Sequence, residues 1–148
     1  MRILLDTHIF LWAITSDSRL SPAQRDLFLD DASDLFLSVA SVWEMLIKTG
    51  LGRLPIPTPC TDYIVRQMEK NRIALLPIRV AHLAELETLP PLPRDPFDRM
   101  LVAQARAEKM PLLSADVLME KSCRDLGTYS QPKRPNDGHA RHQDGSTS

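Results

Sequence analysis

The sequence has little of what holds secreted domains together or anchors proteins in membranes. Its 148 residues include only two cysteines, Cys60 and Cys123, with no CxxC pair and no nearby histidines at zinc-ligand spacing. We therefore expect neither a disulfide framework nor a structural zinc, and we expect a cytoplasmic protein. A strand is expected within two residues of the start, and no apolar run reaches the roughly 18 residues of a membrane span, so we expect neither a signal peptide nor membrane insertion.

The sequence also lacks an excess of charge of either sign. Lys and Arg number 18 against 19 Asp and Glu, which gives a formal net charge of −1. Overall attraction therefore cannot hold a nucleic acid, and any phosphate-bearing ligand depends on local cations. The hydrophobic content of 43% is sufficient for the core of one domain.

Short apolar runs alternate with helical patterns through most of the chain. Strands are expected at residues 3–5, 34–38, 73–78 and 111–115. Helices are expected at residues 8–14, 22–32, 41–50, 61–71, 81–89, 95–109 and 116–126. Because the strands show no polar alternation, the pattern predicts an α/β fold whose parallel sheet is covered by helices on both faces.

The composition changes at about Ser130. From there to the end the chain contains no large apolar residue, only polar, charged and small ones. Such a segment cannot bury enough surface to offset the entropy lost on ordering. We therefore predict one folded domain over residues 1–129 and a disordered tail over residues 130–148.

Four acidic residues follow or adjoin expected strand ends, where each strand gives way to a helix. They are Asp6, Glu44, Asp98 and Asp116. In a parallel sheet these carboxylates converge on one edge, where a bound cation offsets their mutual repulsion. Asp6 is the strongest candidate, because a carboxylate directly after a buried run must meet water, a donor or a cation.

Each acid also has a structural explanation, because helix N-termini attract carboxylates. Ser41 and Glu44 have the spacing of a capping box, and Glu44 precedes Lys48 by the four residues of a helical ion pair. Asp95 is an expected N-cap and Asp98 falls in the first turn of the same helix.

The residues alone therefore leave three functions open. The first is a metal-dependent nuclease, and the second is a metal-dependent phosphoesterase that acts on small molecules. The third is a non-catalytic module whose acidic pocket binds an arginine of another protein. Four acids at separate junctions favour a metal site, because independent caps would include more Ser, Thr and Asn.

Four segments carry a resemblance to a known family: LLDTHIFLW, SVASVWEMLIKTGLGRLP, RDPFDRMLVAQA and LLSAD. In order and spacing they resemble the signatures of PIN-domain proteins and, more narrowly, of VapC-type ribonuclease toxins of type II toxin-antitoxin systems. The similarity covers roughly residues 1–126. It implies a three-layer α/β/α sandwich with a central parallel sheet, and an endoribonuclease that depends on Mg²⁺ or Mn²⁺.

The resemblance also implies roles for particular residues and partners. Catalytic roles pass to the four acids Asp6, Glu44, Asp98 and Asp116, with Asp6, Asp98 and Asp116 as metal ligands. Supporting roles pass to Thr7, Ser114, Asp95 and Arg99. Of these, Thr7 caps a helix or contacts a ligand, Ser114 orients a carboxylate or a bound water, and Arg99 pairs with the acids in preference to RNA. The implied partners are an RNA substrate, a cognate antitoxin and a second copy in a homodimer.

Overall fold

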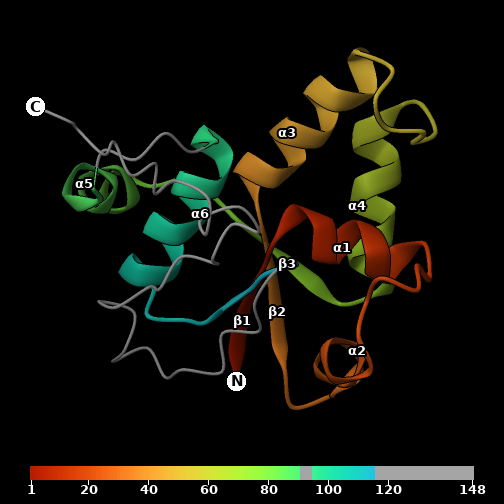
Figure 1. Cartoon of the computed structure of the whole chain (residues 1–148), viewed down its shortest axis with the longest axis horizontal. Coiled ribbons are helices and arrows are strands. Elements are labelled where there is room, and N and C mark those ends of the chain that lie inside the picture. The colour runs from red at the N-terminus through yellow and green to blue at the C-terminus, as the bar shows by residue number, and fades with distance from the viewer. Residues whose placement is uncertain (91–94, 116–148) are drawn as a thin grey trace, which may run out of the picture.

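The computed structural model describes residues 1–90 and 95–115, and this part of the chain forms four strands and six helices (Figure 1). The strands are β1 (Arg2–Leu5), β2 (Asp34–Ser38), β3 (Ile73–Leu76) and β4 (Leu112–Leu113). The helices are α1 (Thr7–Ile14), α2 (Pro22–Leu29), α3 (Val39–Gly50), α4 (Cys60–Lys70), α5 (Val80–Thr88) and α6 (Pro96–Ala107). The expected helix at 116–126 and the expected domain boundary at residue 129 lie outside the described residues.

The strands form one sheet in the order β3-β2-β1-β4, and all three neighbouring pairs are parallel. Leu5, the last residue of β1, is in register with Leu37 of β2 and Leu113 of β4. The carboxyl ends of these strands therefore meet at the same edge, as the sequence predicts. None of the helices in the described ranges is long and apolar enough to cross a membrane.

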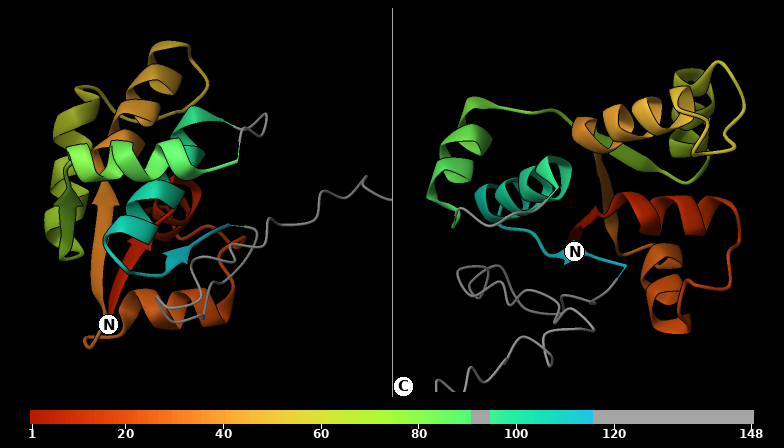
Figure 2. Two further views of the ribbon diagram at one scale, coloured as in Figure 1. Left: turned by 90° about the vertical axis from the view of Figure 1, so that its left-hand side faces the viewer. Right: turned by 45° about the horizontal axis from the view of Figure 1, so that its top comes forward.

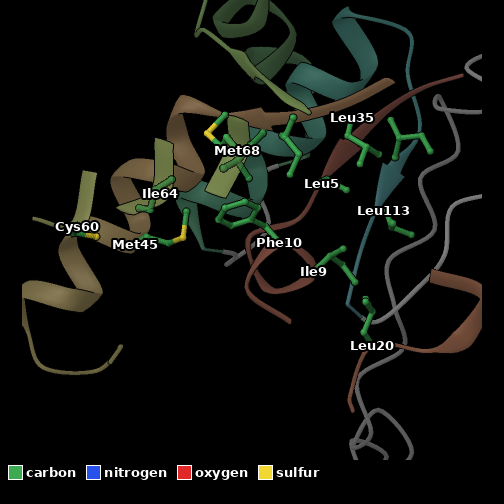
Figure 3. Close-up of a cluster of buried hydrophobic side chains, with 13 residues drawn as sticks. Leu5, Ile9, Phe10, Leu20, Leu35, Met45, Cys60, Ile64, Met68 and Leu113 are labelled. Atoms are coloured by element: carbon green, nitrogen blue, oxygen red, sulfur yellow. The ribbon is translucent and has the colours of Figure 1, made fainter. Parts of the chain in front are cut away.

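Side chains from the two faces of the sheet enter two separate cores. Ile3 and Leu5 of β1 belong to one buried cluster, and Leu4 between them belongs to the other. The first cluster is closed by α1, α3 and α4, as Phe10, Met45 and Ile64 show (Figure 3). The second is closed mainly by residues of α6: Leu101, Val102 and Ala105.

The helices accordingly form a layer on each face of the sheet. In Figure 2, α5 and α6 lie together on one side of the strands, and α1 and α2 lie on the other. This arrangement confirms the predicted three-layer α/β/α sandwich with a central parallel sheet.

Several elements end earlier than the sequence predicts, and two of them do so for clear local reasons. Helix α2 stops at Leu29, because Asp30 adopts an extended backbone and its side chain accepts a hydrogen bond from the Ala32 amide at 2.9 Å. Strand β3 stops at Leu76, because the next residue, Pro77, has no N–H to donate to a neighbouring strand. Helix α6 also ends two residues early and β4 is shorter than expected.

Helix α3 begins earlier than expected, at Val39. The N-cap is Ser38, whose hydroxyl accepts a hydrogen bond from the Ala40 amide at 3.0 Å. The predicted capping box between Ser41 and Glu44 is therefore wrong, since both residues lie within the helix. Ser38 and Ser41 could both cap the helix from their sequence positions. Because β2 ends at Ser38, the helix begins directly after it and Ser38 is the cap.

Candidate active site at the carboxyl edge of the sheet

Asp6 lies where β1 ends and α1 begins, beside the end of β4. Its amide donates to the Leu113 carbonyl at 2.9 Å. One carboxylate oxygen, Oδ1, accepts from the His8 amide at 3.0 Å and makes Asp6 the N-cap of α1. The other, Oδ2, accepts from the Ala115 amide at 3.4 Å. Asp6 is thus held by backbone donors from both strand ends.

The partners of Asp6 keep it ionised. Burial acts to raise the pKa of Asp6, but hydrogen bonds and the nearby charge of His8 outweigh it and leave the pKa below its ordinary value. The His8 Nδ1 atom lies 3.6 Å from Asp6 Oδ1, and this contact raises the pKa of His8 despite its partial burial. At neutral pH, Asp6 is an anion in a fixed orientation.

Glu44 lies on α3 with only 4% of its surface exposed, and both carboxylate oxygens have partners. The Thr7 hydroxyl donates to Oε1 at 2.8 Å, and Lys48 Nζ lies 2.7 Å from Oε2. The Ser41 hydroxyl lies 2.9 Å from Thr7 Oγ1 and, since Thr7 has one hydroxyl proton, Ser41 donates to it. The predicted ion pair with Lys48 is confirmed, whereas the alternative of Thr7 as a helix cap is wrong because Asp6 is the cap.

Asp98 lies in the first turn of α6, on the opposite layer from Glu44. The N-cap is Asp95, whose Oδ1 accepts from the Phe97 amide at 2.8 Å, which confirms its predicted capping role. Phe97 meets Trp43 of α3 edge to face, with ring centroids 5.2 Å apart. Each aromatic residue immediately precedes a site acid, so this contact brings the Glu44 and Asp98 segments together across the edge of the sheet.

The charge of Asp98 is opposed by its surroundings. Desolvation, followed by the negative charges of Asp6, Asp95 and Glu44, raises the pKa of Asp98 from its ordinary 3.8 to about 6, and only the nearby His8 lowers it. The side chain remains exposed, so water screens part of this repulsion. Asp6, Glu44 and Asp98 are therefore close enough to act on one another, although they come from the junction of β1 with α1, from α3 and from α6.

The other predicted residues occupy different surroundings. Ser114 is buried just after β4, and its carbonyl accepts from Gln24 Nε2 at 3.2 Å. Arg99 donates to the Pro90 carbonyl at 2.7 Å, and no ion pair within residues 1–90 and 95–115 includes it. The expected pairing of Arg99 with the acids is therefore wrong in this part of the chain. Asp116 lies outside the described residues.

Ser41 is the site residue that the sequence did not identify. Its side chain is fully buried and extends the hydroxyl chain from Thr7 to Glu44. Ser41 and Glu44 are three residues apart, a spacing that places both on one face of a helix that contains them. A helix predicted to start at Ser38 in place of Ser41 would have put Ser41 inside the helix and beside Glu44.

The donor chemistry of the edge suits a divalent cation. Carboxylate oxygens are the ligands that Mg²⁺ and Mn²⁺ prefer, and the raised pKa of Asp98 records a repulsion that a cation would relieve. Within the described ranges, no three His, Cys, Asp or Glu side chains are already arranged to hold a metal ion. The carboxylate oxygens therefore fit a divalent cation. Of the three described site acids, Asp6 and Asp98 keep some exposure to solvent, whereas Glu44 is buried.

The fold and this edge define a class of protein, a parallel α/β sandwich with acidic side chains gathered beyond the strand ends. The family model of the PIN domain matches residues 3–122. The chain belongs to the PIN domain family.

Two relatives are similar over parts of the chain. Ribonuclease VapC16 of Mycobacterium tuberculosis (strain ATCC 25618 / H37Rv) is 35% identical over 60 residues, which are 40% of this chain and 43% of that protein. The match thus spans less than half of that relative's length. The crystal structure of VapBC2 from Rickettsia felis, bound to a DNA fragment from their promoter, matches 76% of this chain and 86% of the other with a TM-score of 0.57. At 15% identity, this second likeness shows the fold alone.

Proposed function

We propose that this PIN-domain chain is a metal-dependent endoribonuclease that hydrolyses RNA phosphodiester bonds and acts as the toxin of a toxin-antitoxin pair. The observation that carries the proposal is the placement of Asp6, Glu44 and Asp98, from separate elements, at one edge of the sheet, and the raised pKa of Asp98, caused by desolvation and by these acids, supports it. The name of the partial relative, a ribonuclease, favours RNA over other phosphate esters.

The proposed cofactor is Mg²⁺, with Mn²⁺ as the alternative, held by Asp6, Asp98 and Asp116. When bound, such an ion supplies positive charge that polarises a phosphate oxygen and makes a water molecule more acidic. This charge also offsets the desolvation and like-charge repulsion that now oppose ionisation of Asp98.

The chain's own residues divide the remaining work. Asp6 is held by two backbone amides and so offers a fixed anionic oxygen. Glu44 is buried and fixed by Thr7 and Lys48, so it contributes to the electrostatic potential of the site from inside the protein. Asp98 is exposed on the first turn of α6, where a phosphate group can reach it. The supporting role proposed for Ser114 and Asp95 is to orient these groups.

The proposed protein partners are a cognate antitoxin and a second copy of this chain. Apolar side chains of α3 remain exposed: Trp43 by 58%, Leu46 by 38% and Ile47 by 40%. Exposed apolar groups that share a helix face are typical of protein interfaces. The similarity in fold to the toxin-antitoxin complex VapBC2 favours an antitoxin as one partner.

The proposal is tested by incubating the purified chain with RNA, single-stranded DNA and a generic phosphodiester, with and without Mn²⁺. We expect cleavage of RNA that stops on chelation and is lost in Asp6→Asn and Asp116→Asn. Asp26→Asn is the matched control, because Asp26 is an exposed acid of α2 that forms no ion pair in the described ranges. Cleavage of the small diester alone would instead identify a phosphoesterase. Arginine-peptide binding without Mn²⁺ binding or cleavage would identify a binding module.

A further inference from the structure

Lys48 is placed to control the charge of the acidic edge, the carboxyl edge of the sheet where Asp6, Glu44 and Asp98 lie. Its ammonium group lies 2.7 Å from Glu44 Oε2, one helical turn away on α3. The Lys48 side chain is 32% exposed and that of Glu44 is 5% exposed, so the pair runs from solvent into the protein.

The other Lys and Arg residues of the described ranges that form ion pairs do so elsewhere. Arg2 pairs with Glu108, Arg19 with Asp17 and Arg106 with Glu85. Among the Lys and Arg residues in residues 1–90 and 95–115, Lys48 is the one that forms an ion pair with a site acid. Its position is therefore specific to the acidic edge.

We propose that Lys48 is a positioning residue, which acts through Glu44 and supplies the counter-charge of the acidic edge. The inference deepens the proposed ribonuclease function and rests on it. A carboxylate as buried as Glu44 needs a partner for each of its oxygens. Lys48 on Oε2 and Thr7 on Oε1 hold the carboxylate at two points, so its orientation is fixed.

This arrangement has two separable consequences. Loss of Lys48 leaves Glu44 unpaired, which disturbs the geometry needed for reaction more than it disturbs RNA binding. Loss of the ammonium charge also makes the edge more negative, so a divalent cation binds more tightly, by about threefold to tenfold for charges that water and salt largely screen. A role in helix stability alone would produce neither effect.

The experiment compares the full chain with Lys48→Met and Lys48→Arg. Mn²⁺ affinity is measured by calorimetry, and kcat and KM are measured on RNA at saturating Mn²⁺. For Lys48→Met we expect kcat to fall about tenfold or more with KM within about threefold, while Mn²⁺ binds about threefold to tenfold more tightly. Lys48→Arg retains the charge and recovers most of the kcat and the original Mn²⁺ affinity.

Arg106→Met is the matched control. It breaks an ion pair of 2.8 Å between α5 and α6, in which the arginine is 26% exposed against 32% for Lys48, and it touches none of the site acids. We expect wild-type kcat and Mn²⁺ affinity in this variant. An increase in KM with unchanged kcat in Lys48→Met would show that Lys48 holds RNA directly and would overturn the inference, as would wild-type behaviour.

A double variant covers the case in which Lys48→Met does not fold. Glu44→Gln with Lys48→Met removes both charges, so no buried anion is left unpaired. If Lys48 acts through Glu44, this variant has the same kcat as Glu44→Gln alone, and a further loss would overturn the inference. If the wild type binds Mn²⁺ but cleaves no RNA, the proposed function fails, and the Mn²⁺ affinity of Lys48→Met still decides the role of Lys48.

Discussion

At the scale of single residues, the three described acids carry their charges under different conditions. Asp6 is stabilised by backbone amides and His8, and Glu44 is neutralised by Lys48. The ionised form of Asp98 is instead destabilised by desolvation and by the like charges beside it. The acid with the least support is also the most exposed of the three, so it is the one for which a bound cation matters most.

Removing the charge of Asp98 should stabilise the metal-free protein. The pKa of Asp98 is about 6 in the folded chain and near 3.8 without the fold, so folding takes up a proton between these values. Stability from this group is therefore greatest at low pH and is lost as the pH rises from about 4 to about 6. At pH 7 we expect Asp98→Asn to raise the melting temperature by about 1–3 °C, since water screens part of the repulsion.

The matched control for this stability measurement is Asp95→Asn. Asparagine caps a helix as well as aspartate does, so this variant removes a neighbouring charge and keeps the start of α6. Calorimetry in a chelating buffer should show the gain of Asp98→Asn shrinking below about pH 6, where the wild-type group is itself protonated. A lower melting temperature for Asp98→Asn at pH 7 would instead mark Asp98 as a structural first-turn residue.

Thr7 should contribute to stability through the carboxylate that it holds. Thr7→Val keeps the shape of the side chain but leaves Glu44 Oε1 without its buried donor. We expect the free energy of unfolding to fall by about 1–3 kcal/mol, measured by urea denaturation. In the control Thr15→Val, the lost hydroxyl contact is exposed at the end of α1, and the change should stay within about 0.5 kcal/mol. Equal losses in both variants would contradict the account of Glu44.

At the scale of elements, the starts of α1, α2, α3 and α6 are set by short polar side chains at strand or loop ends. Helix α2 has a complete capping box: the Ser21 hydroxyl accepts from the Gln24 amide at 3.1 Å, and the Gln24 side chain accepts from the Ser21 amide at 3.0 Å. Gln24 also donates to the Ser114 carbonyl, so the start of α2 is tied to the end of β4. The cap thus stabilises both a helix and one side of the candidate site.

Loss of this cap should destabilise the chain by a moderate amount. Ser21→Ala removes the acceptor for the Gln24 amide, and we expect a loss of about 0.5–2 kcal/mol in the free energy of unfolding. Ser21→Asp supplies another acceptor at the same place and should retain most of the wild-type stability. Urea denaturation of the two variants provides the comparison, and equal stability of both would show that the cap contributes nothing.

The sequence predicted most elements because their signals are local. The run at residues 34–38 and the pair Asp95-Pro96 specify a strand and a helix start from their own composition. Both Ser38 and Ser41 are possible N-caps of α3 in the sequence. Ser38 is the cap because β2 pairs within the sheet up to that residue, which no local pattern shows. The contact between Thr7 and Glu44 joins residues far apart in the chain, so no local pattern could reveal it.

At the scale of the whole molecule, the sheet brings together acids that the sequence keeps apart. Asp6 follows β1, one of the two inner strands, whereas Glu44 comes from the helix layer on one face and Asp98 from the layer on the other. The two cores fix these layers independently, and the contact of Trp43 with Phe97 joins them at the edge. The sequence could predict convergence at this edge, but not that Glu44 would be buried with both oxygens engaged.

The proposed function depends on the joint action of these acids on RNA. The most direct measurement is the single-turnover rate of RNA cleavage in Mn²⁺ for the wild type, Asp98→Asn and Asp95→Asn. We predict a loss of about 100-fold or more in Asp98→Asn, and a rate within about tenfold of wild type in Asp95→Asn, which retains its helix cap. Equal rates in all three proteins would contradict a catalytic acidic edge.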